Sequence, residues 1–339
     1  MAPIKAVLAN TTTQIGHHGC TLVNRQIEAL AAEAGIEIVA HFPARVSAKM
    51  LAGVPHEAII INGEGSVHHD KHEARGIADL AEMARDSGTP AYLINSVYEA
   101  NTPELGRRIA MFRRVYVRDT TSQKAAIAHG IDAKVVPDLT LSWQHAAQPP
   151  GTRGLVVNDS TRGAVRTRLF ALAQHLGAPF ISMRDEPPIL PDYPDKNLQR
   201  RAIFAFKRAI SLVAPSNQWR GSYRNVIFGF DAFIDWLSAN TGLLVTGRFH
   251  GLCISLDLEI PVLAVASNTS KVQALLADIG LEGRLLADYD AFAERFKAEG
   301  VEGFRFSAED IERIRAFKVS ARERARAMFA DIVADIRNG

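Results

Sequence analysis

The chain has 339 residues, of which 47% are hydrophobic and 22% are charged, and its formal net charge is +2. This length favours two domains that each bury a core, and the near-neutral charge gives no support to nucleic-acid binding. The two cysteines, Cys20 and Cys253, form no CxxC motif, so we expect neither a disulfide framework nor a cysteine zinc site. No apolar run has the length of a membrane span and the N-terminus has no signal-peptide core, which predicts a cytoplasmic protein.

Short apolar runs alternate with helical patterns through the first half of the chain. The stretches between most of these runs have apolar residues three and four positions apart and end in glycine, which is typical of amphipathic helices. Such alternation predicts βαβ units and a mainly parallel sheet. The predicted strands are 4–10, 36–42, 57–62, 91–96, 114–119 and 133–138.

The segment 144–154 has two prolines, two glycines and no periodicity, and we interpret it as a linker. We therefore expect an α/β protein with two Rossmann-like domains, at 1–145 and 154–307, that face a cleft. Ligands of such sheets bind at the carboxyl ends of strands, where loops lead into helix N-termini. In the second half the predicted strands are 154–159, 178–183, 209–215, 242–247 and 260–267.

A long helical pattern ends the chain, and we assign 308–339 to one C-terminal helix. We expect its apolar stripe to dock across the domains, because amphipathicity is the normal state of a surface helix. The alternative is a weak contact between its basic surface and anionic lipid. The stripe consists of Ile311, Ile314, Phe317, Ala321, Ala325, Met328, Ile332 and Ile336, and the basic surface of Arg313, Arg315, Lys318, Arg322, Arg324 and Arg326.

Two polar clusters follow strands of the second half. Arg248 and His250 come after strand 242–247, where a guanidinium offers bidentate donors for phosphate or carboxylate and a histidine can move a proton. Ser270 and Lys271 open the next helix and form a second candidate anion site. The structural alternative for the first cluster is a salt bridge of Arg248 and an interdomain packing contact of His250. For the second cluster it is an ordinary capped helix.

The local pattern also predicts the ends of that second helix. Ser270 with Gln273 matches a capping box, and Gly280 is expected to end the helix.

The first half has two comparable loops. Arg118 and Asp119 leave strand 114–119 ahead of a helix that Thr121 or Ser122 would cap, and a ligand role and a structural ion pair are both open. The loop 10–24 contains His17, His18 and Cys20, and its small and polar residues would let a substrate approach the backbone. We expect Cys20 to be a small buried residue rather than a nucleophile.

The stretch INGEGSVHHDKH, residues 61–72, has three histidines. Asp70 with Glu73 resembles a capping box, which would put His68 and His69 before a helix and His72 in its first turn. Metal chelation by His68 and His72 would need both on continuous helix. We therefore expect a substrate-binding loop rather than a metal site, with a purely structural role as the alternative.

The run VTGRFHGLCISLDLEIPVLAVASNTSKVQALLADIGL, residues 245–281, resembles the C-terminal signature of the polysaccharide pyruvyl transferase family. The order and spacing of the motifs agree over about residues 4–285. The matching residues are Arg248, His250 and Gly251 for an R-x-H-G element, Pro261 for a strand start, Lys271 for a helix start, Arg118, Asp119 and Ser122 for R-D-x-x-S, and Pro137 and Asp138 for P-D. Glu259 replaces the usual glycine two residues before that proline.

The resemblance implies a fold similar to GT-B glycosyltransferases and the transfer of pyruvate from phosphoenolpyruvate to two sugar hydroxyls, with a cyclic ketal formed and phosphate released. It implies no cofactor beyond this donor substrate, and we expect no metal. Arg248, Lys271, Ser270 and Arg118 would bind the donor, and His250 would transfer a proton. Asp119 or Glu64 would be the base.

Two departures from the family pattern fall in the domain expected to bind the acceptor. Gly63-Glu64-Gly65 replaces a glycine triplet, and the first loop reads His17-His18-Gly19. We assign the acceptor to this side of the protein and expect a surface-polysaccharide precursor, linked to lipid or nucleotide. The predicted acceptor contacts are His17, His18, Asn62, Glu64, His68 and His69.

Two other functions stay open at this point. One is a GT-B-type glycosyltransferase that uses a nucleotide sugar, and the other is a non-catalytic sugar-binding or assembly protein. A lipid-linked acceptor would place the protein at the periphery of the inner membrane.

Overall fold

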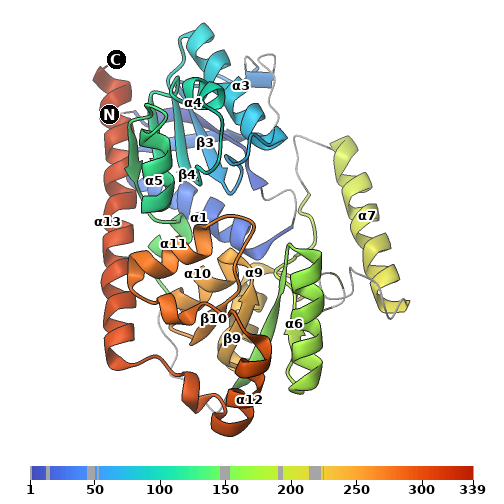
Figure 1. Ribbon diagram of the computed structural model, residues 1–339. Coiled ribbons are helices and arrows are strands. Elements are labelled where there is room, and N and C mark those ends of the chain that lie inside the picture. The colour runs from blue at the N-terminus through green and yellow to red at the C-terminus, as the bar shows by residue number, and fades with distance from the viewer. Residues whose placement is uncertain are drawn as a thin grey trace. The chain divides into compact units, whose positions relative to one another are not determined.

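In a computed structural model the chain falls into two compact units (Figure 1). Unit 1 comprises Met1–Thr12, Val23–Ser142 and Val319–Gly339, and unit 2 comprises Thr13–Leu22 and Trp143–Lys318. The structure describes residues 2–12, 16–43, 50–51, 53–145, 153–189, 194–213, 223 and 225–338. Most of the expected linker, residues 146–152, lies outside this range.

Unit 1 contains a six-stranded parallel sheet in the order β2-β1-β3-β4-β5-β6. The six strands predicted in this half of the chain are confirmed. Their bounds are β1 Ile4–Ala9, β2 Ile36–His41, β3 Ala58–Glu64, β4 Ala91–Ser96, β5 Arg114–Val117 and β6 Ala133–Val135. The order reverses between β1 and β3, which is the usual ligand-binding point of a doubly wound sheet.

Helices cover both faces of this sheet, because successive strand residues point to opposite sides. Val7 and Ile59 belong to a core with α3 and α4, whereas Leu8 and Ile60 belong to a second core with α1 and α13. The helices of unit 1 are α1 His18–Glu33, whose first turn belongs to unit 2, α3 His72–Ser87, α4 Pro103–Ile109 and α5 Thr120–Ile127, with a 3-10 turn at Leu139–Ser142.

The C-terminal helix α13, Ala308–Asn338, begins in unit 2 and ends in unit 1 (Figure 1). Ala325, Met328 and Ile332 lie in the second core of unit 1, and Ile314 is buried in unit 2. Its basic residues form ion pairs: Arg313 with Glu309 and Asp310, Arg315 with Glu259, Lys318 with Asp257 and Arg326 with Glu33. These stripe residues are buried within their own units, and docking of the helix across the domains stays a prediction.

Unit 2 contains a four-stranded parallel sheet in the order β10-β9-β7-β8. Its strands are β7 Gly154–Ser160, β8 Phe180–Ile181, β9 Thr241–Gly247 and β10 Val262–Ala264. Its helices are α6 Gly163–His175, α7 Pro194–Val213, α9 Phe230–Asn240, α10 Phe249–Asp257, α11 Lys271–Ile279 and α12 Tyr289–Glu299, with 3-10 turns at Glu282–Arg284 and Glu302–Phe304.

When the strands of each unit are numbered in chain order, both sheets contain the order 2-1-3-4. In unit 1 this order is β2-β1-β3-β4, and in unit 2 it is β8-β7-β9-β10. Both units are therefore Rossmann-like, as predicted, and the reversal in unit 2 lies between β7 and β9. None of the helices that the structure describes combines the length and the apolar character needed to cross a membrane.

One predicted strand is wrong. Residues 209–213 of the run 209–215 form the end of α7, and the rest of the run lies outside the described residues. The buried side chains Asn197, Phe204 and Ser211 lie seven residues apart, which is two helical turns. This helical period extends through the apolar run and overrides its strand-like composition.

Two predicted helix caps also differ in these units. The helix behind residues 61–72 begins at His72 with Lys71 as its cap residue, and the Asp70 side chain instead accepts a hydrogen bond from Thr102 N at 2.9 Å. Ser270 precedes α11 without a side-chain cap, although Gly280 ends that helix in the left-handed conformation as predicted. The caps fail because nearby loops offer these side chains other partners or another backbone conformation.

Candidate active site

The carboxyl ends of β7 and β9 bring the strongest polar cluster of unit 2 together. The two strands pair with Asn158 opposite Thr246, and β9 runs directly into Arg248 at the start of α10. Thr246 Oγ1 donates to Asn158 Oδ1 at 2.8 Å and accepts from Arg248 N at 3.0 Å. These bonds fix the backbone from which Arg248 and His250 extend.

Arg248 forms a buried two-point ion pair with Asp159 of β7. Arg248 Nε lies 2.8 Å from Asp159 Oδ1, and Nη2 donates to Oδ2. The residues are 7% and 0% exposed. A two-point pair fixes the guanidinium plane, so the remaining N–H groups of Arg248 have a defined direction in which to bind a ligand.

Two further arginines lie within electrostatic reach of this carboxylate. Burial lowers the pKa of Arg166 on α6, and the positive charges of Arg248 and Arg184 lower it further against the effect of Asp159. Burial likewise lowers the pKa of Arg184, whose guanidinium lies 4.7 Å from the centre of the Tyr223 ring. Since guanidinium groups stay cationic in proteins, three positive charges face one aspartate.

The same arginines retain unused hydrogen-bond donors. Within the described part of the chain, the Nε atoms of Arg166 and Arg184 are buried and have no hydrogen-bond partner. A buried donor without a partner is costly, and a cluster with excess positive charge is more so. The arrangement therefore favours a small anion with several oxygen atoms.

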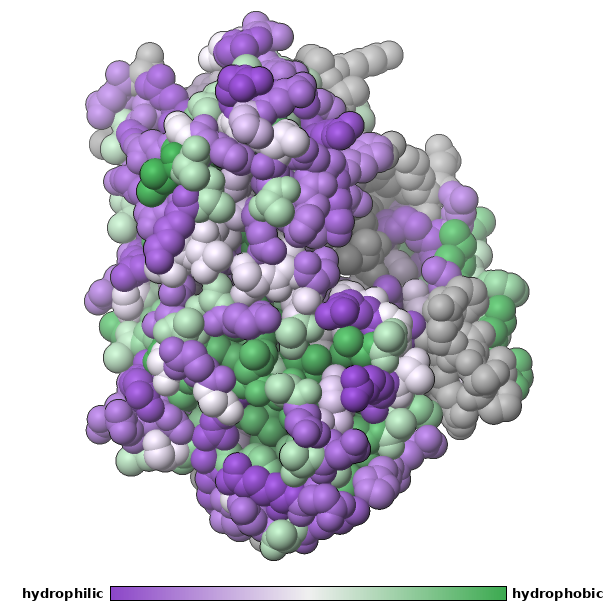
Figure 2. Space-filling view, in the orientation of Figure 1, coloured by the Kyte–Doolittle hydropathy of each residue, from purple (hydrophilic) through white to green (hydrophobic). Residues whose placement is uncertain are grey.

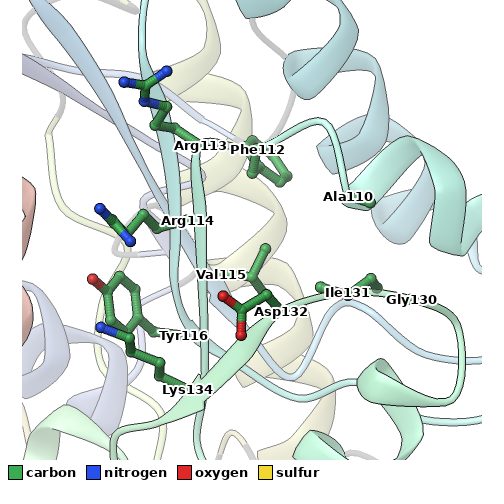
Figure 3. A pocket seen from close by; sticks show the side chains of 10 residues that line it. All are labelled: Ala110, Phe112, Arg113, Arg114, Val115, Tyr116, Gly130, Ile131, Asp132 and Lys134. Atoms are coloured by element: carbon green, nitrogen blue, oxygen red, sulfur yellow. The ribbon is translucent and has the colours of Figure 1, made fainter. Parts of the chain in front are cut away.

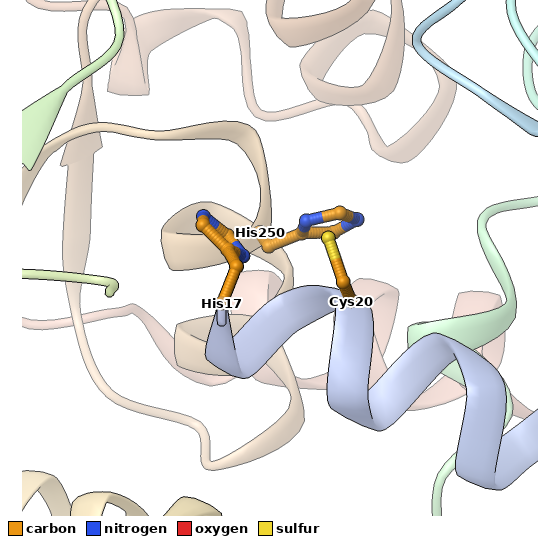
Figure 4. A group of neighbouring side chains, drawn as sticks. All are labelled: His17, Cys20 and His250. Carbon is orange, nitrogen blue, oxygen red and sulfur yellow. The ribbon is translucent and has the colours of Figure 1, made fainter. Parts of the chain in front are cut away.

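Three side chains that can ligate metal ions lie close together in unit 2 (Figure 4). His17, Cys20 and His250 are buried, and their ligand-type atoms lie within 4.8 Å of one another. Figure 4 shows His17 and Cys20, from the start of α1, pointing to the space that His250 enters from α10. The rings of His17 and His250 are 5.7 Å apart, edge to face.

Close backbone packing makes this juxtaposition possible. A Cβ atom on Gly19 would lie 2.3 Å from atoms of His250, and one on Gly251 would lie 2.4 Å from Thr246 Oγ1. Glycine at these positions lets α1 approach α10 and lets α10 approach the strand ends. Close packing against Thr246 therefore explains why the R-x-H-G motif has glycine at position 251.

His17 fits a neutral hydrogen-bond donor better than a metal ligand. Burial, followed by the charge of Arg248, lowers its pKa well below 6.5, so the ring is neutral near pH 7. Its Nδ1 accepts a hydrogen bond from Gly19 N at 3.2 Å, which places the proton of the neutral ring on Nε2. A metal would need an unprotonated nitrogen there, so we derive no step through a metal.

His18, a predicted acceptor contact, occupies a packed interior position. Its ring stacks on Phe233 with centroids 4.1 Å apart, and its Nε2 lies 3.0 Å from Ile227 O. Burial lowers its pKa to about 4, so the ring is neutral near pH 7. This environment suits a structural histidine, and the acceptor role predicted for it stays a prediction.

Ser270 and Lys271, both predicted donor contacts, lie at the start of α11. The Lys271 ammonium is 5.8 Å from the centre of the ring of Phe249, the residue after Arg248. Lys271 thus lies near a residue that is next to Arg248 in the chain, and its donor-binding role stays a prediction.

In unit 1, the R-D and P-D motifs meet in a buried ion pair. Arg118 Nη1 lies 2.7 Å from Asp138 Oδ2, with the two side chains 2% and 0% exposed. Asp138 also accepts hydrogen bonds from Thr140 N at 3.1 Å and Oγ1 at 2.7 Å. The geometry favours the structural alternative for Arg118, with Asp138 as a partner.

Asp119 caps helix α5. Its Oδ1 accepts from Ser122 N at 2.6 Å and its Oδ2 from Ser122 Oγ at 3.1 Å. The prediction that Thr121 or Ser122 is the cap is therefore wrong. The R-D-x-x-S spacing is that of a capping residue and its partner three positions on.

Glu64 ends β3, where the strand order of unit 1 reverses. It is 7% exposed, has a positive φ of 42°, and accepts hydrogen bonds from Thr12 Oγ1 and from Asn62 Nδ2. Asn62 also accepts from Asn95 Nδ2 at 3.1 Å. Glutamate in a left-handed conformation is strained, and such strain is concentrated at functional sites.

His68 and His69 precede α3, as predicted. Their Nδ1 atoms are 2.9 Å apart, and Lys71 Nζ lies 3.3 Å from His68 Nε2. Backbone hydrogen bonds tie the loop to residues 97–102, among them His69 N to Glu99 O at 3.0 Å. His68 is buried and His69 is exposed, so only His69 presents its ring to solvent.

A cavity of about 230 Å³ in unit 1 lies away from these residues (Figure 3). It is lined by Arg113, Arg114 and Lys134, at the amino ends of β5 and β6. Asp335 pairs with both arginines, and Asp331 lies 2.7 Å from Lys134. Because its cations are paired and it opens at the amino ends of the strands, we do not assign it to the active site.

The sequence prediction missed Asp159, Arg166 and Arg184. The strand-end rule could have identified Asp159, which ends the run 154–159, and Arg184, which follows the run 178–183. Arg166 reaches the cluster from within α6, and no local spacing indicates it.

The comparisons with known proteins bear on this site. A family model described as polysaccharide pyruvyl transferase matches residues 22–269. No curated protein matches the chain. Many solved structures also match it, and the three described next are among them.

An uncharacterised protein from Klebsiella pneumoniae has 10% identity and a TM-score of 0.46, over 84% of this chain and 92% of that one. Apo UGT2 from Phytolacca americana has 12% identity and a TM-score of 0.47, over 99% and 100%. The apo form of the lipopolysaccharide outer core galactosyltransferase WaaB has 9% identity and a TM-score of 0.37, over 92% and 98%. At these values the likenesses say nothing about ligands, and the fold assignment rests on the two sheets themselves.

Proposed function

The chain belongs to the polysaccharide pyruvyl transferase family, and from this premise we propose that it transfers the pyruvyl group of phosphoenolpyruvate to a saccharide. One observation supports the donor most directly: Arg248 is held by the buried carboxylate of Asp159, and the nearby Arg166 and Arg184 have buried Nε donors without a hydrogen-bond partner among the residues that the structure describes. Phosphoenolpyruvate has a phosphate and a carboxylate, and guanidinium groups bind both with two-point geometry.

The reaction that we propose is balanced without a cofactor. A proton added to the methylene carbon makes the neighbouring carbon electrophilic, and a first sugar hydroxyl adds there. Cleavage of the carbon–oxygen bond to phosphate and addition of a second hydroxyl then close a cyclic ketal. The methylene carbon gains one proton, the two hydroxyls lose two, and the released phosphate takes the other.

The residues of unit 2 suit the first half of this reaction. Arg248, oriented by Asp159, would hold one anionic group of the donor, and Arg166 and Arg184 would stabilise the charge on the leaving phosphate. His250 would protonate the methylene carbon. Neutral His17 would donate a hydrogen bond from Nε2 rather than a proton.

Of the two bases predicted for the acceptor hydroxyl, Asp119 has both carboxylate oxygens engaged by Ser122. We therefore assign the base to Glu64 and give Asp119 a structural role. Asn62, His68 and His69 stay the predicted acceptor contacts in unit 1.

Thermal shifts separate the donor from its alternative. Phosphoenolpyruvate should raise the melting temperature of the protein, and nucleotide sugars should not. Arg166→Ala should abolish this shift, whereas Arg168→Ala, an exposed arginine on the same helix, should leave it intact. A shift with nucleotide sugars alone would favour the glycosyltransferase alternative and refute the proposal.

Turnover tests the second half of the reaction. Incubation with phosphoenolpyruvate and a panel of lipid- and nucleotide-linked saccharides should release phosphate and yield one product with an added pyruvate ketal mass. A protein that binds the donor but yields neither phosphate nor ketal across the panel would support a non-catalytic sugar-binding role instead.

A further inference from the structure

Helix α7 exposes an unusual amount of apolar surface. Among the described residues, nine large hydrophobic side chains are exposed, and five of them lie on this one helix. They are Leu198, Ile203, Phe206, Leu212 and Val213, with 45–79% of their surface exposed. Figure 2 shows hydrophobic side chains at the right-hand edge of the molecule, where Figure 1 draws α7.

The helix is attached through its opposite side. Asn197, Phe204 and Ser211 are buried at seven-residue spacing, and the Phe204 ring lies 5.6 Å from that of Tyr223 and 6.4 Å from that of Phe228. Residues seven apart share a helix face. The apolar side chains therefore face outward because the inward face is already occupied, so the exposed face is a stable part of unit 2.

Basic residues border this apolar face on both sides. Residues 196–213 include five lysines and arginines and no aspartate or glutamate. At 100° per residue, Arg200 and Lys207 lie on one border and Arg201 and Arg208 on the other. An apolar face between two cationic borders is the pattern of helices that lie in the interface of anionic membranes.

We propose that α7 lies in the surface of a membrane containing anionic lipid, with its apolar face at the level of the acyl chains and its basic borders among the headgroups. The charge selects this occupant over a second copy of the chain. Two copies paired through α7 would bring their basic borders together without acidic partners, because the helix has none after Asp195. The proposal rests on no feature of the donor site, so it stands or falls separately from the proposed reaction.

The neighbouring contacts permit this placement. Arg201 pairs with Glu186, but both side chains are exposed, at 42% and 45%, so headgroup phosphates can compete for the arginine. Arg208 lies over the Phe228 ring, 4.8 Å from its centre, and Phe228 is itself 40% exposed beside α7. The apolar face thus continues from the helix onto Phe228.

Vesicle flotation tests the proposal. The full chain should float with vesicles of phosphatidylcholine and phosphatidylglycerol, less so in high salt, and hardly at all with phosphatidylcholine alone. The triple variant Leu198→Ser, Phe206→Ser, Val213→Ser should lose about tenfold or more of this partitioning, because each serine removes apolar surface from the lipid. The matched control Ile127→Ser, Val319→Ser changes two hydrophobic residues with 57% and 60% exposure on α5 and α13, and should partition as the wild type does.

Circular dichroism and melting curves check that both variants are folded, and sedimentation velocity measures self-association. Absence of wild-type binding to anionic vesicles overturns the proposal without any variant. So does equal loss in both variants, or equal binding to neutral and anionic vesicles. A wild type that self-associates, with a triple variant that is monomeric and binds vesicles unchanged, would assign the face to a second copy and also overturn it.

Discussion

The buried pair between Arg248 and Asp159 allows a prediction with a defined magnitude. Asp159→Asn keeps the side-chain shape but removes the carboxylate that pairs with Arg248 and whose charge also acts on Arg166 and Arg184. Breaking a fully buried ion pair costs about 3–5 kcal/mol, because a charge is left without its partner. Asparagine can still accept one hydrogen bond, so we expect the lower end, about 3 kcal/mol, or roughly 6–12 °C in Tm for a unit of this size.

Glu186→Gln provides the control, because it removes an arginine–carboxylate pair of unit 2 whose side chains are 42% and 45% exposed. Such a pair contributes about 0–1 kcal/mol. Calorimetry in a buffer free of phosphate should separate the two variants clearly. Added inorganic phosphate should then raise the Tm of Asp159→Asn more than that of the wild type, since it replaces the missing negative charge. The reasoning fails if Asp159→Asn is no less stable than Glu186→Gln, or if phosphate stabilises it no more than the wild type.

Three further predictions follow from the described contacts. Burial lowers the pKa of His18 from 6.5 to about 4. The stability that neutral His18 contributes is therefore complete above pH 6.5 and is lost as the pH falls from 6.5 to 4, at about 1.4 kcal/mol per pH unit. In urea unfolding, His18→Gln should lose less stability on the acid side than the wild type does, and parallel curves for the two proteins would contradict the assignment. Asp119→Ala should lower the free energy of unfolding by about 1 kcal/mol through loss of the α5 cap, and should leave kcat within a few fold of the wild type. A fall in kcat of several orders of magnitude would restore Asp119 as the base. Gly251→Ala should reduce both melting temperature and turnover, because the new Cβ would lie 2.4 Å from Thr246 Oγ1. Gly283→Ala is the control, since a Cβ at Gly283 would meet no atom within 4 Å, and it should change neither quantity.

The fold was largely predictable because its strands are buried runs between helices with clear periodicity. Runs such as 58–64 and 91–96 are buried at every position, so each begins with four consecutive apolar residues that are easy to recognise. The run 209–215 failed because composition was considered without the seven-residue period of the buried side chains of α7. The caps failed at Asp70 and Ser270 because a cap depends on loop geometry, which neighbouring segments decide.

The site was predictable only in part. Arg248 and His250 follow a strand and lie in a motif, so both the strand-end rule and the family pattern indicate them. Arg166 reaches the cluster from the middle of its segment, and its role depends on Asp159 of a different strand. Arg118 and Asp119 match a motif but serve an ion pair and a helix cap, which shows that a family motif can mark structure as well as chemistry.

The chain path also limits how relatives of this protein could be recombined. Residues 13–22 precede most of unit 1 in the sequence and yet belong to unit 2, where Gly19 leaves room for His250. A hybrid joined near residue 145 would take this segment from one parent and His250 from the other. Such a hybrid would separate Gly19 from the His250 against which it packs, unless residues 13–22 were exchanged together with the second half.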